Sequence, residues 1–176
     1  MNKQLTNNQD CRDTFCSACI DNDIEKIKVL LNDDIYMAKL NEFILNDNLF
    51  YHATFNNNIE IIKLLLNDER FSPSLNRPNY NKWYPINLAC NNNNVELVKL
   101  ILNDERFTPS LNLPSSNGNT PFFNACAKGY IEIVKLLLQD ERIDVMKPNK
   151  SGLTPLEIAK INKHYEIVKL LEYYIK

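Results

Sequence analysis

The chain has 176 residues, of which 44% are apolar and 24% are charged. This composition excludes a fully disordered protein and predicts one globular domain or two small ones. The 20 basic and 22 acidic residues give a net charge of −2, so no charge excess predicts binding to nucleic acid or to an anionic membrane. Two counts are unusual, because glycine occurs only 3 times and asparagine 27 times.

The first nine residues are polar, and we expect a flexible tail over 1–9. They contain no apolar stretch of the kind that makes a secretory signal, and no later stretch of about 18 apolar residues predicts a membrane span. The cysteines number five. An odd number of cysteines without an export signal favours reduced thiols and a cytoplasmic or nuclear location, including that of a host cell.

A block of eight residues recurs along the chain. Its three closest copies begin at Ile59, Val95 and Ile131, and weaker copies begin at Ile24 and Tyr165. An alanine stands six residues before each copy, at Ala18, Ala53, Ala89, Ala125 and Ala159. This spacing of 34 to 36 residues predicts five repeats in a single domain over 10–176, at about 10–40, 41–76, 77–112, 113–146 and 147–176.

Each repeat is predicted to contain two helices. The block forms the second helix, because its apolar residues recur three and four positions apart and every copy places a lysine three residues after a glutamate. The first helix runs through the alanine, and its start is clearest at Thr120 and Thr154, where an N-cap threonine precedes a proline. The polar ends of the first and last repeats are typical of terminal caps, so we expect the array to be complete.

The segments between the helix pairs also repeat. Asp-Glu-Arg follows three of the blocks, and we expect Arg70, Arg106 and Arg142 to pair with these carboxylates at the surface. A proline stands eleven residues before the alanine in three repeats, at Pro78, Pro114 and Pro148, where it favours an extended chain.

Residues 117–130 and 151–159 read NGNTPFFNACAKGY and SGLTPLEIA. They resemble the G-x-T-P-L-H-x-A-A-x-x-G-H pattern of the ankyrin repeat, and the resemblance extends over about residues 10–176. It implies an all-α solenoid of five helix-turn-helix repeats joined by short β-hairpin loops. It also implies a non-enzymatic module for protein–protein interaction.

The chain departs from the family pattern at three positions of the repeat. The usual histidine is replaced by Cys16, Tyr51, Asn87, Phe123 and Glu157, so its hydrogen bonds between repeats are open to question. The glycine after the first helix is replaced by Asn57, Asn93 and Lys163, and the hairpin glycine by Asn46 and Lys82. A left-handed lysine costs about 1–2 kcal/mol, so we predict that the hairpin at Lys82 is strained or reshaped.

The resemblance implies that partners bind the concave groove and the hairpin tips. The groove positions are the second and third after each alanine: Ile20, Asp21, Phe55, Asn56, Asn91, Asn92, Ala127, Lys128, Ile161 and Asn162. The tip positions are Ile44, Leu45, Asp47, Tyr80, Asn81, Trp83, Ser116, Asn117, Asn119, Lys150, Ser151 and Leu153. These residues differ between copies whereas the second helices are alike. Trp83, the only tryptophan, either anchors a partner or folds back onto the next repeat.

Other functions are less well supported. Cys16 and Cys19 form a C-x-x-C, but Cys19, Cys90 and Cys126 all follow the alanine, where a small buried residue is expected, so we assign no metal and no cofactor. His52 and His164 match no catalytic motif, and we predict no enzyme. We predict a protein partner, no nucleic acid and no membrane, and a monomer with a homodimer as the alternative.

Besides a metal- or redox-linked module through Cys16 and Cys19, two alternatives to an adaptor or competitive inhibitor stay open. The first is an effector of a pathogen or giant virus that sequesters a host protein, since the abundance of asparagine, lysine, isoleucine, tyrosine and phenylalanine suits AT-rich codons and an amoebal, protozoan, bacterial or viral source. The second is a self-assembling structural protein, for which Tyr173 and Tyr174 offer an exposed aromatic patch.

Overall fold

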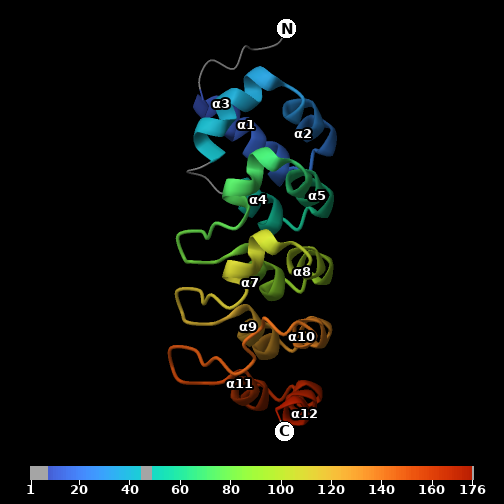
Figure 1. Ribbon diagram of the computed structural model, residues 1–176, viewed down its shortest axis with the longest axis vertical. Coiled ribbons are helices and arrows are strands. Elements are labelled where there is room, and N and C mark those ends of the chain that lie inside the picture. The colour runs from blue at the N-terminus through green and yellow to red at the C-terminus, as the bar shows by residue number, and fades with distance from the viewer. Residues whose placement is uncertain (1–7, 45–48, 176) are drawn as a thin grey trace. The chain divides into compact units, whose positions relative to one another are not determined.

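The computed structural model describes residues 8–44 and 49–175 (Figure 1). Within these ranges every regular element is a helix, and no strand occurs. The chain separates into an N-terminal unit, Met1–Arg77, and a C-terminal unit, Pro78–Lys176. The tail that we predicted over 1–9 lies mostly outside the described residues, and the first helix already begins at Asn8. None of the described helices combines the length and the apolar character needed to cross a membrane.

The N-terminal unit contains the first two helix pairs and several additional helical elements. Its elements are α1 (Asn8–Ile20), α2 (Ile24–Leu31), α3 (Asp34–Ile44), α4 (Leu49–Phe55), α5 (Ile59–Asn67), η1 (Glu69–Phe71) and α6 (Ser72–Leu75). Helix α1 packs against α2, α3 and α4, and α5 packs against α4 and α2. The two predicted helix pairs, α1–α2 and α4–α5, are therefore neighbours within this unit.

Helix α3 corrects the prediction of a hairpin between the first two pairs. Ile44, predicted at a hairpin tip, is the last residue of α3, while Leu45 and Asp47 lie outside the described residues. The side chain of Asp33 caps the start of α3 by accepting a hydrogen bond from the Tyr36 amide at 2.9 Å. Tyr36, Met37 and Leu40 are buried at helical spacing, so apolar burial favours a helix there.

The C-terminal unit contains three helix pairs, whose members form two rows in Figure 1. Its elements are α7 (Pro85–Asn91), α8 (Val95–Leu102), η2 (Glu105–Ser110), α9 (Pro121–Lys128), α10 (Ile131–Leu138), α11 (Pro155–Ile161) and α12 (Tyr165–Tyr174). In one row α9 packs between α7 and α11, and in the other α10 packs between α8 and α12. Loops before α7, α9 and α11 project from the same side of this unit (Figure 1).

The repeated block forms the second helix of each pair, as predicted. In α10, for example, Ile133, Val134 and Leu137 are buried, while Glu132 and Lys135 lie on the exposed face, where their side chains approach to 3.3 Å. The same exposed pairing joins Glu25 to Lys28 at 2.8 Å. Such pairs contribute only a few tenths of a kcal/mol, so burial of the apolar face accounts for most of the stability of these helices.

The turn between the two helices has the same backbone in all five copies. Its fourth residue after the alanine has positive φ in every copy: Asn22 (55°), Asn57 (60°), Asn93 (57°), Gly129 (77°) and Lys163 (61°). The next amide donates to the carbonyl of the alanine at 2.9–3.1 Å, as the Asn94 amide does to Ala89. Asparagine tolerates this conformation better than most residues, which explains its use in place of glycine.

The predicted helix starts at Thr120 and Thr154 are confirmed. The Thr120 hydroxyl accepts a hydrogen bond from the Phe123 amide at 3.1 Å. The Thr154 hydroxyl accepts from the Glu157 amide at 3.2 Å, and the Glu157 carboxylate accepts from the Thr154 amide at 2.8 Å. This reciprocal pair is a capping box, so Glu157, at the family histidine position, caps its own helix.

Two of the three arginines in the Asp-Glu-Arg segments, Arg70 and Arg142, do more than the predicted surface pairing. Arg70 binds Asp68 through two nitrogens, and its Nη2 also donates to the carbonyl of Leu31 at the end of α2, at 2.8 Å. Arg142 binds Asp140 in the same way and donates to the carbonyl of Leu102, the last residue of α8, at 2.7 Å. Each of these arginines therefore satisfies an orphan carbonyl at the end of an earlier helix.

Candidate functional site

The predicted groove residues of the N-terminal unit lie at the ends of α1 and α4, where Ile20 is the last residue of α1 and Phe55 the last of α4. Phe55 is 57% exposed, and its ring stacks on that of Tyr51 with centroids 5.8 Å apart. Asn56 is half-buried, and its side-chain amide donates to the carbonyl of His52 at 2.8 Å. These contacts hold an aromatic pair on the surface of the first helix, with Phe55 accessible to solvent.

The corresponding residues of the C-terminal unit end α7 and α9. Asn92 and Lys128 are exposed, and Asn91 is half-buried. The side-chain amide of Asn91 donates to the side-chain oxygen of Asn92 at 3.2 Å. These three positions on α7 and α9 are polar, in contrast to Phe55 on α4 and to Ile161, which ends α11 and is 58% exposed.

Three loops of the C-terminal unit each contain the same type of turn. In each loop the turn is closed by the backbone amide of the residue after the recurring proline. The Asn79 amide donates to the carbonyl of Trp83 at 3.0 Å, and the Asn149 amide donates to that of Leu153 at 2.9 Å. The side-chain oxygen of Asn79 also accepts from the amides of Asn81 and Trp83, both at 2.9 Å. These Asx turns fix the loops without regular strands, so the predicted hairpins reduce to tight turns.

Lys82 keeps the glycine-type turn and has a left-handed backbone, with φ of 56°. Its amide donates to the Asn79 carbonyl at 2.9 Å, as the Gly118 amide does to Ser115 at 2.8 Å and the Gly152 amide to Asn149 at 3.0 Å. Of the two outcomes that we predicted, the geometry gives the strained turn. The cost of about 1–2 kcal/mol is borne by a residue whose side chain is exposed.

The three loops are joined to one another at their tips. The carbonyl of Asn81 accepts from both the amide and the hydroxyl of Ser116, at 2.9 and 2.7 Å. The Ser116 carbonyl in turn accepts from the ammonium of Lys150 at 2.5 Å. A Cβ at Gly118 would stand 2.5 Å from both the backbone nitrogen and the Cγ of Lys150, so only glycine permits this approach.

The other predicted tip residues differ in exposure. Tyr80 is fully exposed, and Ser151 and Asn117 are also exposed, whereas Trp83 and Leu153 are half-buried. Asn119 is half-buried, and its side-chain oxygen accepts from the Asn149 side chain at 3.3 Å. Asn81, Ser116 and Lys150 therefore form one connected group, and Tyr80 is the aromatic residue most accessible to a partner.

A cleft of about 430 Å³ lies beside these loops. Its lining includes Pro78, Lys82, Tyr84, Leu113, Pro114 and Lys150. Sequence reasoning placed only Lys150 and the neighbouring Ser116 at a binding surface. It missed Lys82, Tyr84 and Leu113, although a lysine at the hairpin glycine position, followed by Trp83 and Tyr84, was a signal at this place.

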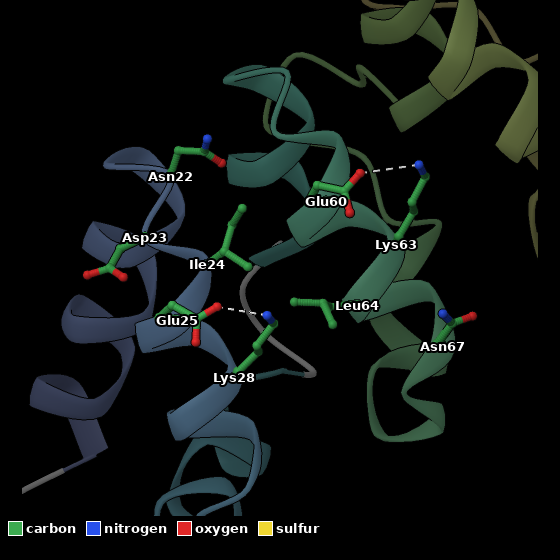
Figure 2. A pocket seen from close by; sticks show the side chains of 9 residues that line it. All are labelled: Asn22, Asp23, Ile24, Glu25, Lys28, Glu60, Lys63, Leu64 and Asn67. Carbon is green, nitrogen blue, oxygen red and sulfur yellow. Dashed lines mark hydrogen bonds and ion pairs between the residues drawn. The ribbon is translucent and has the colours of Figure 1, made fainter.

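A larger cleft, of about 680 Å³, lies between α2 and α5 in the N-terminal unit (Figure 2). Glu25 and Lys28 from α2 and Glu60 and Lys63 from α5 line it, but each pair is joined by an ion pair, at 2.8 and 3.3 Å (Figure 2). Asp23 caps α2 by accepting from the Lys26 amide at 2.9 Å. The charged side chains of this cleft are thus already paired within the chain, so the cleft is the weaker candidate for a ligand site.

Four of the five cysteines are buried in the core, whereas Cys16 is half-buried. Cys19, Cys90 and Cys126 are buried, and burial raises the pKa of the Cys19 thiol to about 12 and the pKa values of the other two thiols as well. Buried protonated thiols are poor nucleophiles and poor metal ligands. Among the described residues, no three His, Cys, Asp or Glu side chains are grouped so as to hold a metal ion.

Asn87 preserves a link between repeats at a position where the family has histidine. Its side-chain oxygen accepts from the Tyr84 amide at 2.9 Å, and its amide donates to the Leu113 carbonyl at 3.3 Å. The residue is fully buried. The substitution therefore keeps the role of tying the first helix of one repeat to the loop of the next.

The comparison with protein families agrees with this architecture. The family model for ankyrin repeats in three copies matches residues 49–149 and, in an overlapping second match, residues 86–176. No curated protein matches the sequence. Ankyrin repeats generally act as protein–protein interaction modules and are typically not enzymes. The matched residues make up most of the chain, and its paired helices, glycine-type turns and Thr-Pro helix starts have the family's form, so the chain belongs to the ankyrin-repeat family.

Proposed function

We propose that this chain is a non-enzymatic recognition module, which binds a partner protein through the exposed face of its first helices and the tips of its loops. It would act by binding alone, as an adaptor or as a competitive inhibitor. An effector that sequesters a host protein would use the same surface.

One observation carries this proposal. The second position after the alanine is a large apolar residue in three of the five repeats, and these side chains stay in solvent: Ile20 is 55% exposed, Phe55 57% and Ile161 58%. The alanines themselves are buried. Exposed apolar residues at one register of a repeat favour contact with a protein, because burying them against a partner releases water and contributes binding energy.

The experiment is affinity capture from a lysate of the source organism, followed by measurement of the affinity for the captured protein. Phe55→Ser and Lys128→Glu should each weaken binding, whereas Lys169→Ser on the exposed side of α12 should not. Trp83→Ala should cost about 2 kcal/mol of binding energy if Trp83 is an anchor. Equal binding by all four variants, each shown to be folded by circular dichroism, would contradict the proposal.

Self-association is a second candidate, supported by the surface of α12. Tyr165, Tyr173 and Tyr174 are 65%, 82% and 49% exposed, and Ile175 is 39% exposed. Light scattering at several concentrations tests it, with Tyr173→Ser as the variant that should lower the mass if this surface pairs. A mass equal to the monomer at every concentration would reject it.

A further inference from the structure

The cleft beside the three loops of the C-terminal unit combines apolar lining with unpaired positive charge. Tyr84, Leu113 and the prolines at 78 and 114 supply the apolar part. Lys82 and Lys150 supply two ammonium groups, and no carboxylate is among the described residues that line the cleft. Its volume of about 430 Å³ lies within the range of about 300–1,000 Å³ typical of ligand sites.

The charge of Lys82 is not used within the described part of the chain. Its backbone closes the turn, but its ammonium makes neither an ion pair nor a hydrogen bond there, and the side chain is exposed. Glycine closes the same turn at Gly118 and Gly152, so the turn itself does not require a lysine. Its ammonium is therefore available to an acceptor that a bound partner supplies.

Lys150, in contrast, is held in place. Its stem lies over Gly118, where a Cβ would collide with its Cγ at 2.5 Å. Its ammonium donates to the Ser116 carbonyl at 2.5 Å, which leaves two of its three N–H groups for another acceptor. The link from Ser116 to Asn81 fixes the loop that carries Lys82, so both lysines are positioned by the same network.

We propose that this cleft binds an extended acidic segment of a protein partner, in which carboxylates flank an aliphatic residue or a proline. The inference rests on the proposed function and specifies the chemistry of the partner. The carboxylates would accept hydrogen bonds from Lys82 and Lys150, and the apolar residue would cover Tyr84 and Leu113. A polyphosphate is the poorer match, because the net charge of −2 supplies no general attraction for it.

The probe is a labelled peptide with the central sequence Glu-Leu-Pro-Glu between glycine and serine flanks, titrated into the ¹⁵N-labelled full chain. Amide resonances of residues 82–84, 113–116 and 150 should shift, excluding the proline, which has no amide proton. The matched peptide Gln-Leu-Pro-Gln should bind about tenfold more weakly, because charge-assisted hydrogen bonds are lost. The affinity of the acidic peptide should also fall as salt is raised.

Two variants remove the charges. Lys82→Gly relieves the strain and should not destabilise the loops. Lys150→Met keeps an apolar stem over Gly118 but loses the hydrogen bond to the Ser116 carbonyl, so circular dichroism must first show that this variant is folded. Each should weaken binding of the acidic peptide by about tenfold. Lys163→Gly is the matched control, because Lys163 has the same left-handed backbone, with φ of 61°, but lies after α11 outside the cleft. Its affinity should equal that of the parent chain.

Three results would overturn the inference: equal affinity for the Glu and Gln peptides, unchanged affinity in both lysine variants, or tighter binding of a short single-stranded DNA at the same amides. The proposed function is judged separately, with the captured partner. If that partner is lost on Phe55→Ser or Lys128→Glu but retained by Lys82→Gly and Lys150→Met, protein recognition stands and the cleft is rejected. If the peptide binds the cleft but neither lysine variant weakens binding of the captured partner, the cleft does not bind that partner and the inference is rejected as well.

Discussion

Gly118 and Gly152 occupy the same position of two loops and differ in their surroundings, so alanine at each position separates backbone strain from crowding. Their φ angles are 85° and 80°. A Cβ at Gly152 would meet nothing within 4 Å, whereas one at Gly118 would stand 2.5 Å from the backbone nitrogen of Lys150. We expect Gly118→Ala to destabilise the C-terminal unit considerably more than Gly152→Ala.

The magnitudes follow from these two facts. A left-handed alanine costs about 1–2 kcal/mol, and the smaller entropy of the unfolded alanine chain returns about 0.4–1 kcal/mol, so Gly152→Ala should cost about 1 kcal/mol. At Gly118 the overlap involves backbone, which cannot rotate away as a side chain can. Moving the loop that carries Lys150 adds the cost of overpacking, about 1–3 kcal/mol, for a total of about 2–4 kcal/mol.

Urea unfolding followed by tryptophan fluorescence measures both losses, because Trp83 is the only tryptophan and lies in the same unit as the two glycines. With a slope of about 1–3 kcal/mol per molar urea, a difference of about 2 kcal/mol separates the two midpoints by roughly 1 M. Equal midpoints for the two variants would refute the reasoning, since strain alone would then explain both. A parallel Gly118→Ala measurement in the peptide titration should also show weaker binding, as Lys150 is displaced.

Three further predictions concern buried and paired groups. Asn124→Leu should stabilise the protein by about 1–3 kcal/mol in urea unfolding, because the buried Asn124 Nδ2 finds no acceptor among the described residues. Leu88 occupies the same position in the preceding repeat, so a leucine fits this register. A loss of stability would contradict the prediction. Hydrogen bonds from Arg106 lower the pKa of Asp104, so its contribution to stability is complete above the unfolded pKa of about 3.9 and is lost as pH falls through the lower, folded value. The unfolding free energy should therefore decrease on acidification below about pH 5, and Asp104→Asn should make that decrease shallower; an unchanged slope would argue against the pair. Burial raises the pKa of the Cys126 thiol, so a thiol reagent should label Cys126 only on unfolding, and rapid labelling of the native protein would contradict its placement in the core.

The helix pairs could be predicted from the sequence because their determinants are local. The repeated block, the threonine before proline and the alanine six residues before the block each act within about one helical turn of their own position. The left-handed turn after the first helix was predictable for the same reason. It needs only one residue that tolerates positive φ and one amide that reaches the carbonyl of the alanine.

Helix α3 was missed because it lies where the repeat pattern leads one to expect a loop. Its apolar residues Tyr36, Met37 and Leu40 have helical spacing, but they fall outside the recurring block, which is the pattern that predicts the other helices. The Tyr36 hydroxyl donates to the backbone carbonyl of Cys11 in α1, a contact that local patterns cannot anticipate. The first helix pair is therefore followed by a packed helix in place of the expected tip.

The candidate site was predictable in its register and only partly in its composition. Loop tips and the ends of first helices were identified from position alone. The reach of Arg70 to Leu31, however, joins residues 39 positions apart, and the contact of Lys150 with Ser116 joins residues 34 apart. Such contacts depend on how one repeat stacks on the next. The sequence of a single repeat does not determine that stacking. The cleft lined by Lys82, Tyr84 and Leu113 arises from the same stacking.

The scarcity of glycine also has a structural explanation. All three glycines have positive φ, and among the described residues five others share that conformation: Asn22, Asn57, Asn93, Lys82 and Lys163. The hydrogen bonds that close the turns are the same whether the residue is glycine, asparagine or lysine. The turns are therefore determined by those bonds and by the packing of the helices they join. Asparagine pays little for this geometry, so most of the backbone strain is concentrated on the two lysines. Lys163 is equally strained but lies outside the cleft, so comparing Lys82→Gly with Lys163→Gly separates the loss of an ammonium group from the cleft from the relief of backbone strain.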